Sequence, residues 1–170
     1  MKNIGSYLWK LIESILKFFV YRVLHLSLSE KAWDSLLQFV KFAIVGLSNT
    51  VIGYLLYAVS LKLLRAFHIF PAVDIYIAQL IMFLLSVLWS FYWNNKTVFK
   101  AEEGEHRNIG KALLKTYASY AFTGLFLSEL LLLLWVRVLG VSEYVAPIIN
   151  LLVTVPLNFI IQKFWAFRKK

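Results

Sequence analysis

A short segment directly after a long apolar run carries the residues best suited to polar chemistry. It reads "SFYWNNKTVF" over residues 90–99 and contains Asn94, Asn95 and Lys96 among aromatic side chains. Amides both donate and accept hydrogen bonds, and a lysine adds a positive charge with three donors. This set suits a polar, anionic lipid headgroup such as a sugar phosphate. The simpler interpretation is that this segment is the water-exposed end of a membrane helix, which aromatic side chains anchor at the interface.

A second segment repeats the pattern. "NFIIQKFWAF", residues 158–167, aligns with residues 90–99 without a gap, so that Gln162 falls on Asn94. The preceding helices correspond too, because "FVKFAIVG" and "YASYAFTG" place two aromatic residues and a glycine at identical spacing. Apolar sequences can align by chance. The matched amide and aromatic positions nevertheless favour a duplication into two hairpins of the same orientation.

The composition indicates a membrane protein. The chain has 170 residues, of which 61% are hydrophobic and only 16% are charged. The absence of cysteine excludes disulfides and thiol catalysis, and three histidines far apart in sequence argue against a metal site. No cofactor is expected. The net charge of +9 is more typical of membrane orientation and contact with anionic lipids than of nucleic-acid binding in so apolar a chain.

Four apolar runs are long enough to span a bilayer, since a span needs about 20 apolar residues. They cover residues 38–61, 74–93, 113–136 and 144–163. The loops between them cover residues 62–73, 94–112 and 137–143. The sequence therefore predicts an all-α integral membrane protein whose four transmembrane helices form two parallel-repeat helical hairpins.

The segment before the first span has a different pattern. Residues 4–26 place apolar side chains at helical spacing, with charges every three to five residues. This pattern predicts an amphipathic interfacial helix, with a signal peptide as the alternative. The expected organisation is an N-terminal cytoplasmic helix and linker over residues 1–35 and a transmembrane domain over residues 36–170.

Basic residues set the expected orientation. Six Lys or Arg lie in residues 1–41, five in 96–115 and four in 163–170, which is 15 of the 18. The other side keeps only Lys62 and Arg65 in one loop region and Arg137 in the second turn. The positive-inside rule therefore places both termini in the cytoplasm.

Polar residues inside the spans form stripes on one face of each helix. The stripe of the fourth span is Asn150, Thr154, Asn158 and Gln162, and that of the second is Gln79, Ser86, Ser90 and Asn94. The first span aligns Gly46, Asn49, Thr50, Gly53 and Tyr57, and the third aligns Thr116, Ser119, Tyr120 and Thr123. All four helices could turn a mildly polar face to a common interior. Interhelical packing and hydrogen bonding is the alternative for any single residue.

Glu129 is the acidic residue that lies well inside a span. It is off the polar face of its helix. It could meet another protomer, line a cavity or be protonated, and an ionisable residue at this depth is a candidate functional acid.

The sequence resembles the GtrA-like family of small bacterial membrane proteins over about residues 36–168. The resemblance lies in "KFAIVGLSNTVIGYLLY" and in the two endings quoted above. Motif positions fall on Lys41, Asn49, Thr50, Asn94, Asn95, Lys96, Phe99, Gln162, Lys163, Trp165 and Phe167. Gln162 departs from the asparagine that is more frequent in the second ending, and Glu129 matches no family position.

The resemblance implies translocation of a polyprenyl-phosphate-linked monosaccharide from the cytoplasmic to the outer leaflet of the bacterial inner membrane, for cell-surface polysaccharide glycosylation. It implies no enzymatic step, and a membrane glycosyltransferase as partner. A parallel homo-oligomer is expected, because four short helices enclose little volume. The alternative is a non-transporting subunit that docks or stabilises the glycosyltransferase. Candidate lipid-phosphate and sugar-binding residues are Lys41, Asn49, Thr50, Ser90, Asn94, Asn95, Lys96, Asn158, Gln162, Lys163 and Trp165.

Overall fold

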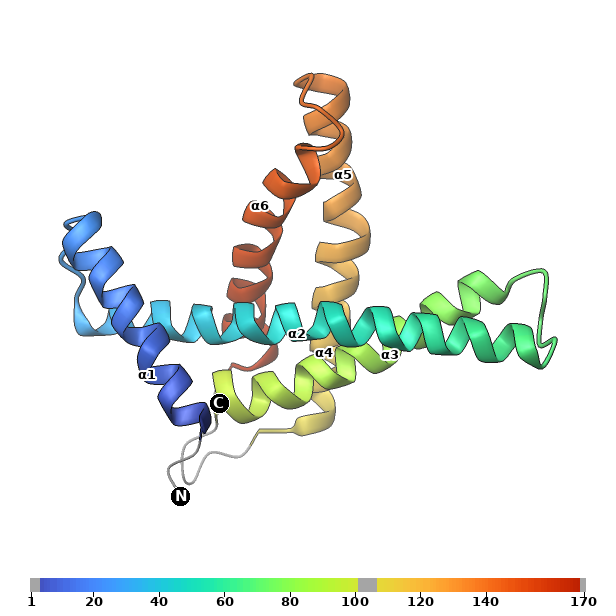
Figure 1. Cartoon of the computed structure of the whole chain (residues 1–170), viewed down its shortest axis with the longest axis horizontal. Helices are drawn as coiled ribbons and strands as arrows, with labels where there is room; N and C mark the ends of the chain where they lie inside the picture. The colour runs from blue at the N-terminus through green and yellow to red at the C-terminus, as the bar shows by residue number, and fades with distance from the viewer. Residues whose placement is uncertain (1–3, 101–106, 169–170) are drawn as a thin grey trace. The chain divides into compact units, whose positions relative to one another are not determined.

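The computed structural model describes residues 4–100 and 107–168, and every regular element in these ranges is helical (Figure 1). The predicted all-α fold is therefore confirmed. The chain divides into two compact units, Met1–Val40 and Lys41–Lys170, which are described separately here. The parts of the predicted N-terminal segment, central loop and basic tail that fall on residues 1–3, 101–106 and 169–170 lie outside the described residues.

The first unit contains an amphipathic helix. Helix α1, Ile4–Lys17, continues into the wider turn η1, Phe18–Val23. Large apolar side chains such as Leu8 and Leu11 are exposed on it. On the polar face, Lys17 pairs with Glu13 at 3.0 Å, one helical turn away. The predicted helix is thus present, and its location at a membrane surface stays a prediction.

Among the residues that the structure describes, four helices are long and apolar enough to cross a membrane (Figure 1). The first is α2, Glu30–Ala66; the second is α3, Asp74–Trp93, followed by η2, Asn94–Val98. The third joins α4, Ile109–Ala121, η3, Phe122–Leu127, α5, Ser128–Leu133, and η4, Leu134–Val138. The fourth joins α6, Ala146–Ile161, and η5, Gln162–Ala166. Each predicted span overlaps one of these helices, and the fourth, predicted over 144–163, begins in the turn before Ala146.

The helix ends follow from local chemistry. The side chain of Asn108 accepts a hydrogen bond from the Lys111 amide at 2.9 Å and so caps the start of α4. Helix α6 begins with a proline in its first turn, where a missing amide hydrogen costs nothing. Gly140 adopts a φ of 65° between η4 and α6, a conformation that a glycine accepts without strain.

Each half of the second unit is a helical hairpin held by small and polar residues. In the first hairpin, residues 41–98, a Cβ on Gly53 would lie 3.7 Å from Met82 Cγ, and Trp89 Nε1 donates to Ser48 Oγ at 3.2 Å. In the second hairpin, residues 107–167, Asn150 Nδ2 donates to Ser128 Oγ at 2.7 Å. Such contacts are typical of helix pairs in membranes, where apolar surface alone does not drive association.

Large apolar side chains cover the outer surface of these helices. Val51, Leu125, Leu152 and Val138 are between 61% and 72% exposed. Polar residues such as Thr116 have no exposed surface. This inversion of the soluble pattern is expected where lipid replaces water around the helices.

Candidate functional site

The two predicted amide segments meet at one point. Asn94 Nδ2 donates to Gln162 Oε1 at 3.5 Å, and neither side chain has exposed surface. Within each helix the amide also donates to the residue four positions earlier, Asn94 to Ser90 Oγ at 3.2 Å and Gln162 to Asn158 Oδ1 at 3.3 Å. Four predicted site residues therefore form one buried network. We call Asn94 and Gln162 the amide pair.

The aromatic residues around the amide pair are arranged with a local two-fold pattern. The rings of Phe99 and Phe167, equivalent in the repeat, stack with centroids 4.7 Å apart. Phe91 contacts Phe167 at 5.5 Å, and Phe159, the equivalent of Phe91, contacts Phe99 at 5.9 Å. Reciprocal contacts between equivalent residues are the mark of a two-fold relation. The parallel repeat predicted from sequence is thus present in side-chain packing.

Both helices end in the same backbone device. The Phe99 amide donates to the Asn94 carbonyl and the Phe167 amide to the Gln162 carbonyl, each at 2.8 Å across five residues. The same bond across five residues also closes η1, from Leu24 to Phe19, and η4, from Leu139 to Leu134, so the turn itself does not mark the site. The two wide turns begin at Asn94 and Gln162, so the turn geometry determines the direction of these two side chains.

One member of the network departs from the two-fold pattern. The Tyr120 hydroxyl lies 2.6 Å from Ser90 Oγ, which links the third long helix to the second. Its equivalent in the first hairpin is Phe42, which has no hydroxyl and packs on Phe159 with centroids 5.5 Å apart. Tyr120 was missing from the predicted binding set, although its place on the polar stripe was a usable signal.

Lysines next to the amide pair lie over aromatic rings. Lys96 Nζ donates to Tyr92 Oη at 3.1 Å and lies 5.6 Å from the centre of the Trp93 ring. Lys163 Nζ lies 5.4 Å from the Phe159 ring. Cation–π contacts hold a positive charge in place at modest cost. Two predicted basic residues therefore sit close to the amide network.

Two further basic residues, which are not among the predicted site residues, also lie in this region. Arg107 Nη1 donates to Asn95 Oδ1 and to the Phe99 carbonyl, both at 2.8 Å. Lys115 Nζ donates to the Trp165 carbonyl at 2.8 Å and lies 5.2 Å from its ring. Arg107 lies in the loop before α4 and Lys115 lies within α4, but nothing in their spacing indicates these partners.

Other predicted residues lie outside the network. Thr50 is exposed, and its hydroxyl donates to the Gly46 carbonyl at 3.2 Å. The polar face expected for the first span thus reaches the interior only in part. Asn49 is half-buried, and its Oδ1 has no hydrogen-bond partner within the described structure. Lys41 is half-buried at the start of the second unit.

Glu129 is exposed on α5. In the repeat alignment its equivalent in the first hairpin is Val51, which is 61% exposed. It is therefore not part of the buried network and sits on an outward surface, where a carboxyl group in hydrocarbon is costly unless it is neutral or covered.

The amide pair has unused hydrogen-bonding capacity. Asn94 donates through Nδ2, whereas its buried Oδ1 has no partner within the described structure. A buried acceptor without a partner costs free energy. A ligand hydroxyl could satisfy it, but only if the two hairpins separate, because the pair has no exposed surface.

The fold and this network define a class of protein: a multi-pass membrane protein with four spanning helices, built as two repeated hairpins that meet at a polar point flanked by lysines. Residues 41–167 match the family model described as GtrA/DPMS, transmembrane domain. The chain belongs to this family, which associates it with lipid-linked sugar transport. A comparison with curated proteins finds no match.

Proposed function

We propose that this chain moves a polyprenyl-phosphate-linked monosaccharide from the cytoplasmic to the outer leaflet, for glycosylation of a cell-surface polysaccharide. The observation that carries the proposal is the amide pair, in which two family motifs meet and a buried Asn94 acceptor has no partner. Its chemistry matches a sugar, which offers several hydroxyls.

The lipid phosphate would first meet the basic residues beside the amide pair. Lys96 and Lys163 lie over aromatic rings there, and Lys115 is close to Trp165. A phosphate attracts such charges strongly, because charge-assisted hydrogen bonds are about twice as strong as neutral ones. The prenyl chain would remain in lipid, beside the apolar outer surfaces.

Separation of the hairpins would then exchange protein contacts for sugar contacts. The bond between the two amides is long at 3.5 Å, so little hydrogen-bond energy is lost when it opens. Asn94, Gln162 and Asn158 could replace water around the sugar hydroxyls. No covalent bond forms or breaks in this step, and it needs no cofactor.

The same proposal includes location and partners. The excess of basic residues beside the amide pair favours a cytoplasmic position for that end and for both termini, in a bacterial inner membrane. A membrane glycosyltransferase would supply the lipid-linked sugar. A parallel homo-oligomer would enlarge the enclosed path, and the exposed Glu129 favours a second copy against α5.

Reconstitution tests the function directly. Purified protein in liposomes should expose a labelled polyprenyl-phosphate sugar from the inner leaflet to an impermeant reagent outside. Asn94→Leu and Gln162→Met keep side-chain size but remove the amides, so both should lower the rate at least tenfold. Ser48→Ala is the matched control, since it removes one interhelical bond, that from Trp89, outside the network.

The alternative is an accessory subunit, which the complete burial of the amide pair favours because buried amides also serve as interhelical contacts. A rate equal to that of protein-free liposomes, combined with glycosyltransferase activity that still requires the chain, would establish this alternative. Equal rates in the wild type and both amide variants would show that translocation does not use the amide pair.

A further inference from the structure

The first hairpin carries a second polar feature at its other end. A hollow of about 450 Å³ runs along one face of α2. Its lining residues are Tyr54, Tyr57, Ala58, Leu61, Lys62 and Arg65. We call it the Tyr–Lys groove. These positions share one face because they are spaced three or four residues apart, and they cover about 16 Å of helix at 1.5 Å per residue.

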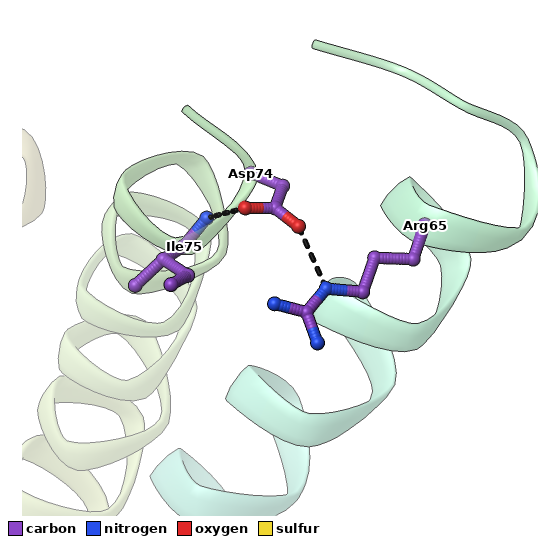
Figure 2. Close-up of polar contacts among 3 residues, drawn as sticks. All are labelled: Arg65, Asp74 and Ile75. Atoms are coloured by element: carbon purple, nitrogen blue, oxygen red, sulfur yellow. Dashed lines mark hydrogen bonds and ion pairs between the residues drawn. The ribbon is translucent and has the colours of Figure 1, made fainter. Parts of the chain in front are cut away.

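One basic residue of the groove is held in place by α3. Arg65 Nε donates to Asp74 Oδ2 at 2.7 Å, and Asp74 Oδ1 accepts from the Ile75 amide at 2.7 Å. Figure 2 shows the Asp74 carboxylate bonded to Nε of Arg65, with no bond drawn to the two terminal nitrogens of the guanidinium. The side chain of Arg65 is 59% exposed. Because Arg65 also lines the groove, its terminal guanidinium donors are available to a ligand there.

The other polar residues of the groove are accessible as well. Lys62 is exposed, and Tyr54 is 69% exposed, while Tyr57 is half-buried. The residues nearer the middle of the helix are aromatic or apolar, and the residues at its end are basic. This order matches an anionic lipid lying along a helix, with its chain in hydrocarbon and its phosphate at the surface.

The groove and the amide pair lie at opposite ends of the first hairpin. Helix α2 runs to Ala66, and α3 returns from Asp74 to the amide segment. If these helices span a bilayer, Lys62 and Arg65 face one side and Asn94 the other. Lys62, Arg65 and Arg137 are the three basic residues that the charge pattern assigns to that side. Two of the three sit in the groove.

Aromatic and basic residues near span ends often serve only as membrane anchors. Anchors need no common face and no recess. Here six residues share a face around one hollow, and an ion pair fixes the direction of Arg65. Anchoring alone also does not explain why two of the three basic residues on the side opposite the amide pair lie together in this groove.

We propose that the Tyr–Lys groove binds the phosphate of an anionic lipid on the membrane side opposite the amide pair, with Lys62 and Arg65 as phosphate donors and Tyr54 and Leu61 along the lipid chain. In the proposed function, this lipid is the translocated polyprenyl-phosphate sugar, and the groove is where it rests before release. The identity of the lipid rests on that function, whereas phosphate binding at the groove does not.

Photocrosslinking tests binding without any transport. The full chain in detergent carries p-benzoyl-phenylalanine in place of Tyr54 and is irradiated with citronellyl phosphate, a short prenyl phosphate. Citronellol, the matched uncharged alcohol, is used in parallel, and mass spectrometry locates the adduct. The phosphate should crosslink in preference to the alcohol. Lys62→Gln should weaken its apparent affinity about fivefold, the effect of one basic side chain on an anionic headgroup.

Arg137→Gln is the matched control, because it removes one exposed charge from the same side but from the other hairpin. It should leave crosslinking unchanged. Equal labelling by the phosphate and the alcohol, or equal labelling in Lys62→Gln and wild type, would overturn the proposal. Gel filtration of each variant checks that the protein is folded.

Competition by inorganic phosphate distinguishes the source of the ligand. Loss of the adduct at millimolar phosphate would mean that the groove recognises phosphate with or without a lipid chain. Retention would mean that the chain is required, and both results support a phosphate site. Preserved crosslinking in a protein that fails the liposome assay would refute the proposed function and leave the groove assignment intact.

Discussion

The two hairpins of the second unit are alike at one end and different along the rest of their length. At the amide pair, Asn94 matches Gln162, and Phe99 matches Phe167 in stacking and in backbone hydrogen bonds. Farther along, Asn150 of the second hairpin holds Ser128, whereas the first hairpin has Met82 against Gly53. The duplication is therefore retained where the hairpins meet.

The difference indicates where each hairpin is constrained. A contact between equivalent residues across a two-fold limits both copies at once, because a change in either must suit the same partner. Residues that contact only their own hairpin have no such limit. The amide pair and the phenylalanine stack fall in the first class, and Asn150 and Asp74 fall in the second.

The largest expected effect concerns the phenylalanine stack. Phe99→Ala and Phe167→Ala each remove a buried ring, since the two side chains are 5% and 2% exposed. Each should lower the free energy of unfolding by about 3–5 kcal/mol. Denaturation in detergent micelles, followed by circular dichroism, measures both. The double variant should lose less than the sum, because the rings contact each other.

Phe164→Ala is the control for this pair, since Phe164 is 65% exposed and should matter little. A large effect at one stacked position with none at the other would contradict the two-fold equivalence of the hairpins.

A smaller effect is expected where the hairpins differ. Asn150→Met gives the second hairpin the residue that the first has at Met82. It removes the donor to Ser128 Oγ and carbonyl, at 2.7 and 3.1 Å, and should destabilise the protein by about 1–2 kcal/mol. The same denaturation assay checks it. Met82→Leu, a swap of similar volume, should cost less than Asn150→Met. If Met82→Leu costs more than Asn150→Met, packing at position 82 contributes more to stability than the hydrogen bonds of Asn150.

The sequence was sufficient for the four long helices and for the equivalence of Asn94 and Gln162, but not for their contact. Apolar length marked all four helices, and the gapless alignment paired Gln162 with Asn94, whereas the hydrogen bond between them is seen only in the structure. Both results rest on periodicity and composition, which are properties of the chain itself. The predicted binding role of these residues stays a prediction.

The sequence did not predict which side chains contact each other across helices. Tyr120 reaches Ser90 because of how far α4 is rotated about its axis, and that rotation is set by packing. Arg107 lies in a loop region, where no period constrains direction. Thr50 shows the same limit, because a helical stripe gives a shared face but not the neighbour that the face meets.

A third prediction concerns the outward surface on which the hairpins differ. Glu129→Val copies Val51 of the first hairpin. If a second copy covers Glu129, the variant should weaken self-association by about 1 kcal/mol, or about fivefold in the dissociation constant. Energy transfer between labelled protomers in liposomes measures this. Glu129→Gln keeps a hydrogen-bonding side chain and should associate like the wild type. Equal transfer in all three proteins would place Glu129 away from any interface between copies.

The smallest effect is expected at the far turn, where the alignment pairs Asp74 with Ser142. Asp74→Ser removes the ion pair with Arg65 and the oxygen that accepts from the Ile75 amide at 2.7 Å. Because Arg65 is 59% exposed, solvent screens this pair, and the cost should be the smallest of the four. The cost should shrink further in 1 M salt, since screening weakens the charge attraction but not packing. Ser142→Asp, which has no basic partner among the described contacts, should gain nothing. A cost for Asp74→Ser that is independent of salt would mean that Asp74 acts through its hydrogen bond to the Ile75 amide at the start of α3, and the two turns would then differ in that bond and not in charge.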